Sequence, residues 1–483
     1  MKEKSLKDKT VSGLSWSVLD KLLQNAFVFV AGILLARLID KEGYGLMGVL
    51  AIFVGLANIL HESGFSSAII RKKNITQADY TTVFFLNISI GIFLYLLLFF
   101  LAPLISNYYD KPILTDLSRY LFLSFLFNSF AVVQNAKLIK EINYKLITKI
   151  NAFSVFTSYS VTLLLAYLGF GVWALATQVV LWTFLKVCCL WIFSRWKPSG
   201  SFSKESFKDL FAFSSKLVLG SIINSVMVNI PQNILGKFYS LSIGGLYNLA
   251  YRNYNSANDV LNGSIYSVSY PILSSIHDDD HRLKYIFRKF IRIKAFVIFP
   301  MFMGIILVAQ SFMYILGEQW LSAAPILQLL CIGGIFAGLE TTNGDILRIK
   351  GKSGLILILT IMHAALIFSS ICIPFIFGLS YLYYIAGIST TYIIRYIVSS
   401  IMSNKLINYS LVELIKDLLP YFGISFICIL CGFMLRFVIA QPIILMICQI
   451  VFVAALYIGT LYFSKARILR EAIEYVTNKR IKK

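Results

Sequence analysis

Polar, charged and aromatic side chains recur at helical spacing within an apolar stretch in the middle of the chain. They stand three or four residues apart, at Asn248, Arg252, Asn255, Asp259, Asn262 and Tyr266. This spacing places them on one face of an α-helix. A guanidinium can bind phosphate through two-pronged, charge-assisted contacts, and amide and tyrosine side chains suit hydroxyl-rich sugars. Because a continuous polar face cannot lie against lipid, the pattern predicts either a water-filled cavity or a polar seam in which Arg252 pairs with Asp259.

Other apolar segments carry polar residues as well. Ionisable groups at membrane depth are costly, so each needs a partner or access to water. The further candidates for a cavity lining are Lys21, Gln24, Arg37, Asn58, Glu62, Lys216, Asn224, Gln232 and Glu340. The two lysines could instead extend to the inner membrane surface. Pro231 cannot donate a helix hydrogen bond, so it predicts a kink or hinge.

The composition is that of a membrane protein. Of the 483 residues, 58% are hydrophobic and 14% are charged, and the mean hydropathy is +0.77. A soluble domain is nearer half apolar and a quarter charged. The apolar runs are long and continuous, which favours α-helical spans over the alternating strands of an outer-membrane barrel. The chain is therefore predicted to be an all-α integral membrane protein.

Fourteen apolar runs have about the length that a bilayer requires. They cover residues 14–38, 44–66, 81–105, 117–136, 150–169, 171–194, 209–236, 243–272, 288–316, 321–347, 354–376, 379–402, 412–438 and 441–463. The serine-rich linker at 195–206 separates two groups of six runs. This grouping predicts an N-terminal lobe at 1–198, a C-terminal lobe at 199–404, and a final helix pair with a basic tail at 405–483.

The two predicted lobes share a weak sequence repeat. At an offset of two hundred residues, Leu35, Gly45 and Leu46 match Leu235, Gly245 and Leu246, and a basic residue, Arg37, matches Lys237. The matches need no gap, which indicates a duplicated unit. The repeat predicts two pseudo-symmetric six-helix lobes.

The net charge of +21 is distributed in a way that excludes nucleic acid as a partner. Alternate loops are basic, as shown by Lys72, Lys140, Lys204, Lys294 and Lys350. The opposite loops carry little more than Lys41, Lys111 and Lys237. By the positive-inside rule, both termini are expected in the cytoplasm. The basic tail from residue 465 is expected to lie as an amphipathic helix on the inner surface.

No set of residues indicates catalysis. His277 and His281 flank three aspartates in a predicted solvated loop, and Cys428 and Cys431 form a CxxC in apolar surroundings that favours packing over zinc or redox chemistry. A phosphate-binding loop of the GxxxxGK[ST] type is absent from the sequence. We expect no metal, no cofactor and no enzymatic activity.

Short motifs in both halves resemble the Wzx-type polysaccharide flippases of the multidrug/oligosaccharidyl-lipid/polysaccharide exporter superfamily. In the first half these are LLARLIDKEGYGLMG at 34–48 and SGFSSAIIRKK at 63–73. In the second half they are GLYNLAYR at 245–252 and LGEQWLSAAPILQLL at 316–330. The order of the motifs most resembles the branch that exports repeat units of lipopolysaccharide, colanic-acid or teichuronic-acid type.

The resemblance implies two six-helix lobes around a central cavity, with an additional C-terminal helix pair. It implies that an undecaprenyl-diphosphate-linked oligosaccharide is moved from the inner to the outer leaflet of the bacterial cell membrane by alternating access. Membrane lipids, H⁺ or Na⁺ as a coupling ion, and polysaccharide polymerase and chain-length proteins are the further partners implied. Arg252 best matches a basic cavity position of such flippases, whereas residues 44–66 have no Arg or Lys at their middle.

Two other classes of protein compete with this interpretation. A cation- or proton-coupled multidrug exporter of the same superfamily would use buried carboxylates, for which Asp20, Glu62, Asp259 and Glu340 are candidates. A polysaccharide polymerase or ligase would need a large outer loop with catalytic groups. None of the predicted outer loops is long, which disfavours the membrane enzyme.

Overall fold

The computed structural model describes residues 24, 27–61, 69, 75–194, 196–199, 202–204, 207, 221–222 and 225–464. These residues form α-helices with short 3₁₀ and π turns, and no strand occurs among them. The chain divides into two compact units, Met1–Asn248 and Leu249–Lys483. This division differs from the predicted boundary near residue 198, and the three predicted regions remain a hypothesis.

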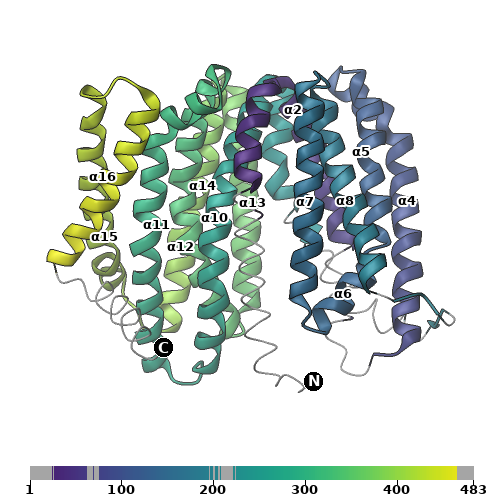
Figure 1. Ribbon diagram of the computed structural model, residues 1–483. Coiled ribbons are helices and arrows are strands. Elements are labelled where there is room, and N and C mark those ends of the chain that lie inside the picture. Colours follow the sequence, from purple (N-terminus) through teal and green to yellow (C-terminus); the bar gives the residue numbers. More distant parts are fainter. Residues whose placement is uncertain are drawn as a thin grey trace, which may run out of the picture. The chain divides into compact units, whose positions relative to one another are not determined.

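In its described part, the first unit consists of helices and a π turn. The helices labelled in Figure 1 are α2 (Lys41–His61), α4 (Gln77–Tyr109), α5 (Ile113–Ser129), α6 (Val132–Lys140), α7 (Tyr144–Tyr167) and α8 (Val172–Ser194). Residues 225–234 are also helical and continue into the π turn η2 (Leu235–Tyr239). Helices α4, α5, α7 and α8 form the blue part of Figure 1, in which α5 packs against both α4 and α8.

The second unit contains most of α10 (Leu241–Ser275), which begins in the first unit. It continues with α11 (Asp280–Leu316), η3 (Glu318–Ala323), α12 (Ala324–Ile349), α13 (Ser353–Ile376), α14 (Tyr381–Leu406), α15 (Leu411–Met434), η4 (Leu435–Phe437) and α16 (Pro442–Phe463). The last two long helices pack against each other and against α11, as Figure 1 shows. Helix α12 packs mainly against α11 and α14.

Local sequence signals set several helix starts. Thr76 accepts a hydrogen bond from the Asp79 backbone N–H at 3.2 Å, and the Asp79 carboxylate accepts from the Thr76 N–H at 2.9 Å. This capping box satisfies two backbone donors that the first turn of α4 cannot pair internally. At the start of α2, Asp40 Oδ1 accepts from the Gly43 N–H at 3.0 Å. The polar stretch at residues 39–45 (IDKEGYG) therefore follows the end of the helix Phe27–Leu38 and contains the start of α2.

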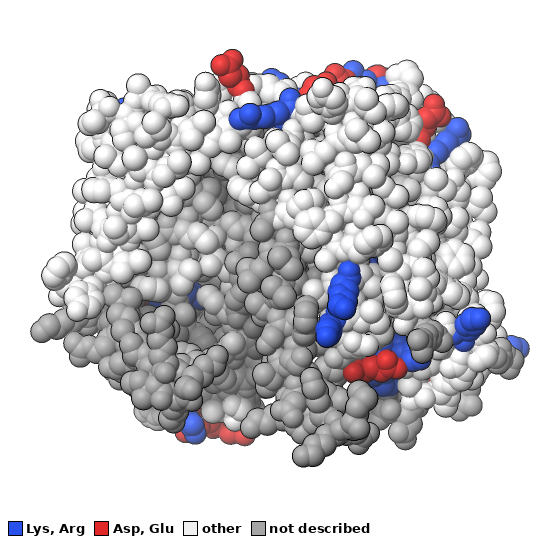
Figure 2. All heavy atoms as spheres, in the orientation of Figure 1, with Lys and Arg blue, Asp and Glu red and all other residues white. Residues whose placement is uncertain are grey.

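Nine of the described helices are long and apolar enough to cross a membrane. A tenth span is formed if α5 and α6, which bend by 45° at their junction, are counted together. Helix α4 presents large exposed apolar side chains, including Phe93, Phe100 and Leu104, as expected for a surface in contact with lipid. In the face drawn in Figure 2, the charged side chains lie along the upper edge and in the lower half. The chain is a multi-pass membrane protein.

The nine helices coincide with nine of the fourteen predicted spans, and the bent pair contains a tenth, residues 117–136. About half of each of the predicted spans 14–38 and 209–236 lies outside the described residues, and the described parts include the helical residues 27–38 and 225–234. Helix α2 covers most of residues 44–66, and α10 covers 243–272, but neither helix is among the nine. The polar residues of α10 reduce its apolar character, so hydropathy alone does not mark it as a span. The count of fourteen remains a prediction.

Candidate functional site

Helix α10 has two chemically different faces in the second unit. Ala250, Tyr254 and Leu261 are buried, with exposed fractions of 0%, 7% and 7%. Arg252 and Asn255 are half-buried on the other side, and Asp259 is exposed. The Asn255 Nδ2 donates to Asp259 Oδ2 at 2.9 Å. The structure therefore brings these two predicted residues together on an accessible polar face, with Arg252 one turn before them.

The buried face of α10 is fixed by close packing against α11 and α12. The rings of Tyr254 and Phe302 are 5.9 Å apart. Gly334 of α12 leaves room for the Tyr254 ring, because a Cβ at this position would overlap that ring and lie 3.2 Å from Phe302 Cε1. Since this packing determines how α10 is rotated, it also keeps Arg252 and Asp259 on the accessible side.

Two other predicted residues meet in the first unit. Asn248 Nδ2 donates to Gln232 Oε1 at 3.1 Å, and Gln232 Nε2 donates to the Gly244 carbonyl at 3.2 Å. Gln232 is only 5% exposed. A Cβ on Gly48 of α2 would overlap the Gln232 amide, so this polar bridge fits only beside a glycine. Gln232 thus joins the helix before η2 to α10, which is a structural role for a residue predicted to line a cavity.

Glu340 of α12 belongs to a polar chain that crosses three helices. Arg395 Nε of α14 donates to Glu340 Oε1 at 3.3 Å, and its second nitrogen lies 3.2 Å from His363 Nδ1 of α13. His363 Nε2 lies 3.2 Å from the Thr391 hydroxyl. Sequence reasoning missed Arg395 and His363. The signal that could have found Arg395 is an ionisable residue inside the predicted span 379–402.

A second buried polar group joins α11 to α12. Lys294 is 1% exposed; its ammonium donates to the Gly338 carbonyl at 3.2 Å and to the Thr341 hydroxyl. Asp345 is fully buried and accepts from Arg348 at 2.9 Å. Lys294 is one of the basic residues that predict the inner side of the membrane, and it lies within α11, which begins at Asp280. The basic stretch at 282–294 therefore belongs to a helix, and its side of the membrane stays a prediction.

The structure describes only some of the remaining predicted site residues. Gln24 is half-buried, and Arg37 is exposed near the end of the helix Phe27–Leu38. Pro231 is buried, and the π turn begins four residues after it. Asn58 lies in α2, and Asn262 and Tyr266 lie in α10, by their backbone positions. Four residues lie outside the described part of the chain: Lys21, Glu62, Lys216 and Asn224.

The described residues contain no group of three or more His, Cys, Asp or Glu side chains that could hold a metal ion. His277 is exposed, and its Nε2 lies 3.2 Å from the Asp278 carboxylate. In the helical regions, Glu340 instead pairs with Arg395 across α12 and α14, and Asp345 pairs with Arg348 within α12. Such pairing lowers the cost of burying charge between spans.

The fold is that of the membrane transporters to which the flippase MurJ and the MATE proteins belong. The backbone is similar to the lipid II flippase MurJ in an inward closed conformation, with a TM-score of 0.75, 16% sequence identity, and coverage of 95% of this chain and 100% of the other. It is also similar to an inward-facing multidrug resistance MATE transporter, with a TM-score of 0.64, 16% identity, and coverage of 80% and 94%.

The chain belongs to the polysaccharide biosynthesis protein family, which matches residues 34–325. It is 29% identical to the lipopolysaccharide biosynthesis protein WzxC of Escherichia coli, over 72% of this chain and 71% of that protein. It is 26% identical to the teichuronic acid biosynthesis protein TuaB of Bacillus subtilis, over 73% of each chain. The resemblance to Wzx-type proteins inferred from the sequence motifs is confirmed.

Proposed function

We propose that this protein is a flippase that moves an undecaprenyl-diphosphate-linked oligosaccharide from the inner to the outer leaflet. The observation that carries the proposal is the accessible polar face of α10, with Arg252, Asn255 and Asp259 opposite the buried Tyr254. Arg252 would bind the diphosphate, because a guanidinium matches phosphate in charge and geometry. Asn255 and the other amides would bind sugar hydroxyls. No covalent chemistry is needed, so the protein acts as a transporter and not as an enzyme.

Transport would proceed by alternating access between two pseudo-symmetric six-helix lobes around a central cavity, with a final helix pair outside them. Several contacts in the first unit support this view. Lys237 of η2 forms an ion pair with Asp110 at 3.2 Å. The Tyr109 hydroxyl donates to Asn233 Oδ1 at 2.8 Å. By the predicted orientation, these contacts lie at the outer side. They would hold the outer ends of the two repeats together while the substrate enters from the inside, and Pro231 would serve as the hinge.

The proposal includes a location and partners. The protein would lie in the bacterial cell membrane with fourteen spans and both termini in the cytoplasm. Membrane lipids would surround it, H⁺ or Na⁺ would supply the driving force, and a polysaccharide polymerase and a chain-length protein would receive its product. Relatives named for lipopolysaccharide and teichuronic acid biosynthesis support a precursor of a surface polysaccharide as the cargo.

A reconstituted system tests the function directly. The purified protein is placed in liposomes whose inner leaflet carries a fluorescent undecaprenyl-diphosphate-linked oligosaccharide, and its arrival in the outer leaflet is measured with a membrane-impermeant quencher. We expect the protein to accelerate translocation, whereas undecaprenyl phosphate without sugar should not compete. Translocation at the rate of empty liposomes would overturn the proposal.

The multidrug exporter remains the second candidate, since buried carboxylates are present. In the structure, however, Glu340 contacts Arg395 and Asp345 contacts Arg348. Each of these two carboxylates therefore already has a protein partner, which disfavours a role as an open cation- or drug-binding site.

A cysteine-labelling series distinguishes the candidates. In a variant without the seven native cysteines, Asn255→Cys should react with a water-soluble thiol reagent, and Ala250→Cys, at a fully buried position, should not. Lipid-linked oligosaccharide should protect Asn255→Cys. Protection by cationic drugs alone would favour the exporter. Equal, slow labelling of both variants would indicate a structural polar seam.

A further inference from the structure

A cavity of about 360 Å³ lies where α14 ends and α15 begins, away from the polar face of α10. Its lining combines apolar side chains, Ile401 and Leu411, with polar ones, Asn404 and Lys405, and with the loop residue Tyr409. Asn408 in the same loop has a left-handed backbone conformation with φ 51°. This conformation turns the chain sharply between the two helices and leaves the space open.

Asn404 is the most informative residue of this cavity. Its side chain is only 4% exposed, yet neither Oδ1 nor Nδ2 has a hydrogen-bond partner among the described residues. Buried amides are normally paired, and an unpaired one is costly. The amide can donate and accept at once, so it suits a ligand that carries both an oxygen acceptor and a hydroxyl donor.

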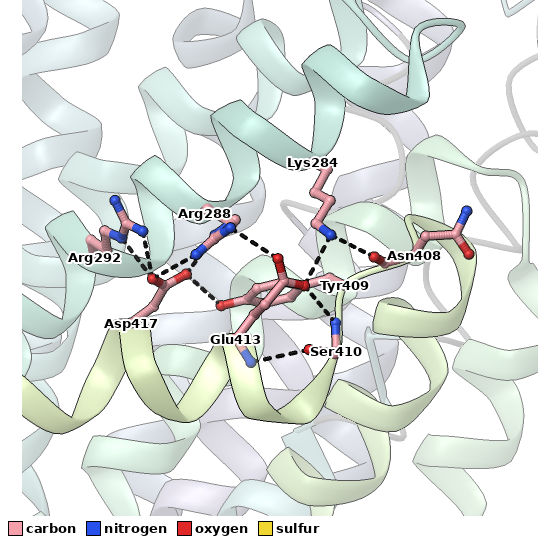
Figure 3. Close-up of polar contacts among 8 residues, drawn as sticks. All are labelled: Lys284, Arg288, Arg292, Asn408, Tyr409, Ser410, Glu413 and Asp417. Carbon is pink, nitrogen blue, oxygen red and sulfur yellow. Dashed lines mark hydrogen bonds and ion pairs between the residues drawn. The ribbon is translucent and has the colours of Figure 1, made fainter.

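The charges beside the cavity favour an anionic ligand. Arg288 of α11 forms a two-pronged pair with Asp417 of α15, at 2.7 Å and 3.1 Å, and also binds Glu413 at 3.0 Å. Arg292 binds Asp417 as well, at 2.6 Å, as Figure 3 shows. Both carboxylates are thereby neutralised by cations and do not repel an anion.

Tyr409, in the loop that lines the cavity, is held within the same network. Its hydroxyl donates to Asp417 Oδ2 at 2.8 Å (Figure 3). Burial and this hydrogen bond raise the pKa of the Tyr409 hydroxyl above its ordinary value, so Tyr409 remains protonated and neutral. Lys284 is paired with Glu413 at 2.9 Å.

Lys405 differs from these cations. It is exposed at the cavity and has no ion-pair partner in the described part of the chain. The apolar surface next to it continues along α15, where Leu411, Val412 and Ile415 are exposed by 50%, 61% and 57%. An ammonium beside a lipid-facing apolar surface is the arrangement that binds the headgroup of an anionic lipid while its acyl chains cover the helix.

We propose that this cavity binds the headgroup of an anionic glycerophospholipid, with its phosphate on Lys405, its glycerol hydroxyl or ester oxygens on Asn404, and its acyl chains along Leu411 and Val412. The site is separate from the α10 face and does not depend on what the protein transports. By the predicted orientation, the lipid comes from the inner leaflet. The bound lipid stabilises the junction of α14 with α15.

Native mass spectrometry of the full-length protein tests the proposal with phosphatidylglycerol, phosphatidylcholine and glycerol phosphate as probes. We expect phosphatidylglycerol to bind with clear preference over phosphatidylcholine. Lys405→Gln should weaken it about tenfold, the effect of losing one charge-assisted hydrogen bond. Asn404→Leu, which is nearly isosteric and cannot hydrogen-bond, should also weaken it. Lys416→Gln is the matched control, because Lys416 is exposed on α15 but does not line the cavity.

Three outcomes would overturn the proposal. One is equal binding of the two phospholipids. Another is competition by glycerol phosphate as strong as that of the intact lipid, which would assign the cavity to a soluble phosphate. The third is unchanged binding in both Lys405→Gln and Asn404→Leu, with thermal stability raised by Asn404→Leu; this result would mean that Asn404 binds only water.

Discussion

Gly45 of α2 and Gly245 of α10 pack reciprocally against each other's helix. A Cβ on Gly45 would overlap the carbonyl oxygen of Leu241, and a Cβ on Gly245 would overlap that of Lys41 and lie 3.1 Å from the Gly45 nitrogen. The glycines are two hundred residues apart, as are Lys41 and Leu241. The two contacts are therefore equivalent in the sequence repeat, and they join its copies backbone to backbone.

This crossing leads to a prediction about stability. Gly45→Ala and Gly245→Ala should each destabilise the protein by about 1–3 kcal/mol, the usual cost of overpacking, because backbone atoms cannot move aside as a side-chain end can. Thermal unfolding in detergent measures the effect. Gly459→Ala is the control, since a Cβ there meets nothing within 4 Å. Equal melting temperatures for all three variants would refute the close packing.

Replacement of Arg252 should abolish export without unfolding the protein. Arg252→Ala removes the guanidinium from the accessible face of α10 but leaves the buried packing of Tyr254 intact. Arg252→Lys should restore only part of the activity, because lysine keeps the charge and loses the planar fork. Surface polysaccharide in a deletion strain and protein abundance in the membrane are the measurements. Arg436→Ala, an exposed arginine of η4, is the control; full export by Arg252→Ala would exclude this residue from the site.

Among the residues that join α11 to α15, Asp417 should be the one whose substitution lowers the stability of the protein most. Asp417→Ala leaves Arg288, Arg292 and the Tyr409 hydroxyl without their shared acceptor, as Figure 3 makes clear. Removal of one partner from a buried charge cluster costs about 3 kcal/mol. The melting temperature should fall accordingly, and Asp278→Ala, at an exposed position, should leave it unchanged. A small loss in Asp417→Ala would mean that water replaces the carboxylate.

The contact between Asp110 and Lys237 should change during transport. An exposed ion pair contributes only about 0–1 kcal/mol, so its role would be in gating more than in stability. In a cysteine-free background, Asp110→Cys with Lys237→Cys should be cross-linked by a short bifunctional maleimide, and the cross-link should stop export. Each single variant treated in the same way should remain active. Full transport by the cross-linked protein would show that this contact does not open.

The orientation can be tested by labelling from outside intact cells. Gly378 lies in the turn between α13 and α14, and His281 lies at the start of α11; both are exposed. If the basic loops are cytoplasmic, a membrane-impermeant thiol reagent should reach Gly378→Cys and miss His281→Cys. The opposite pattern would invert the topology of the whole chain.

The sequence by itself determined the class of structure and the family. Long apolar runs can satisfy their backbone groups in a membrane only as helices, so nine predicted spans coincide with observed helices. Spacings of three and four residues also placed Arg252, Asn255 and Asp259 on one face, because helix geometry is local. The ordered motifs of both halves were sufficient to identify the polysaccharide biosynthesis family.

Only the tertiary structure decided which polar residues contact each other. Arg395 meets Glu340 from 55 residues away and Arg288 meets Asp417 from 129 residues away, and no local pattern encodes such distances. Gln232 is predicted from its polarity to line a cavity, and in the structure its amide forms hydrogen bonds with Asn248 and with the Gly244 carbonyl. The reason is physical: a helix period specifies which side chains share a face, whereas the rotation and crossing of neighbouring helices specify what that face meets, and these depend on packing across the whole unit.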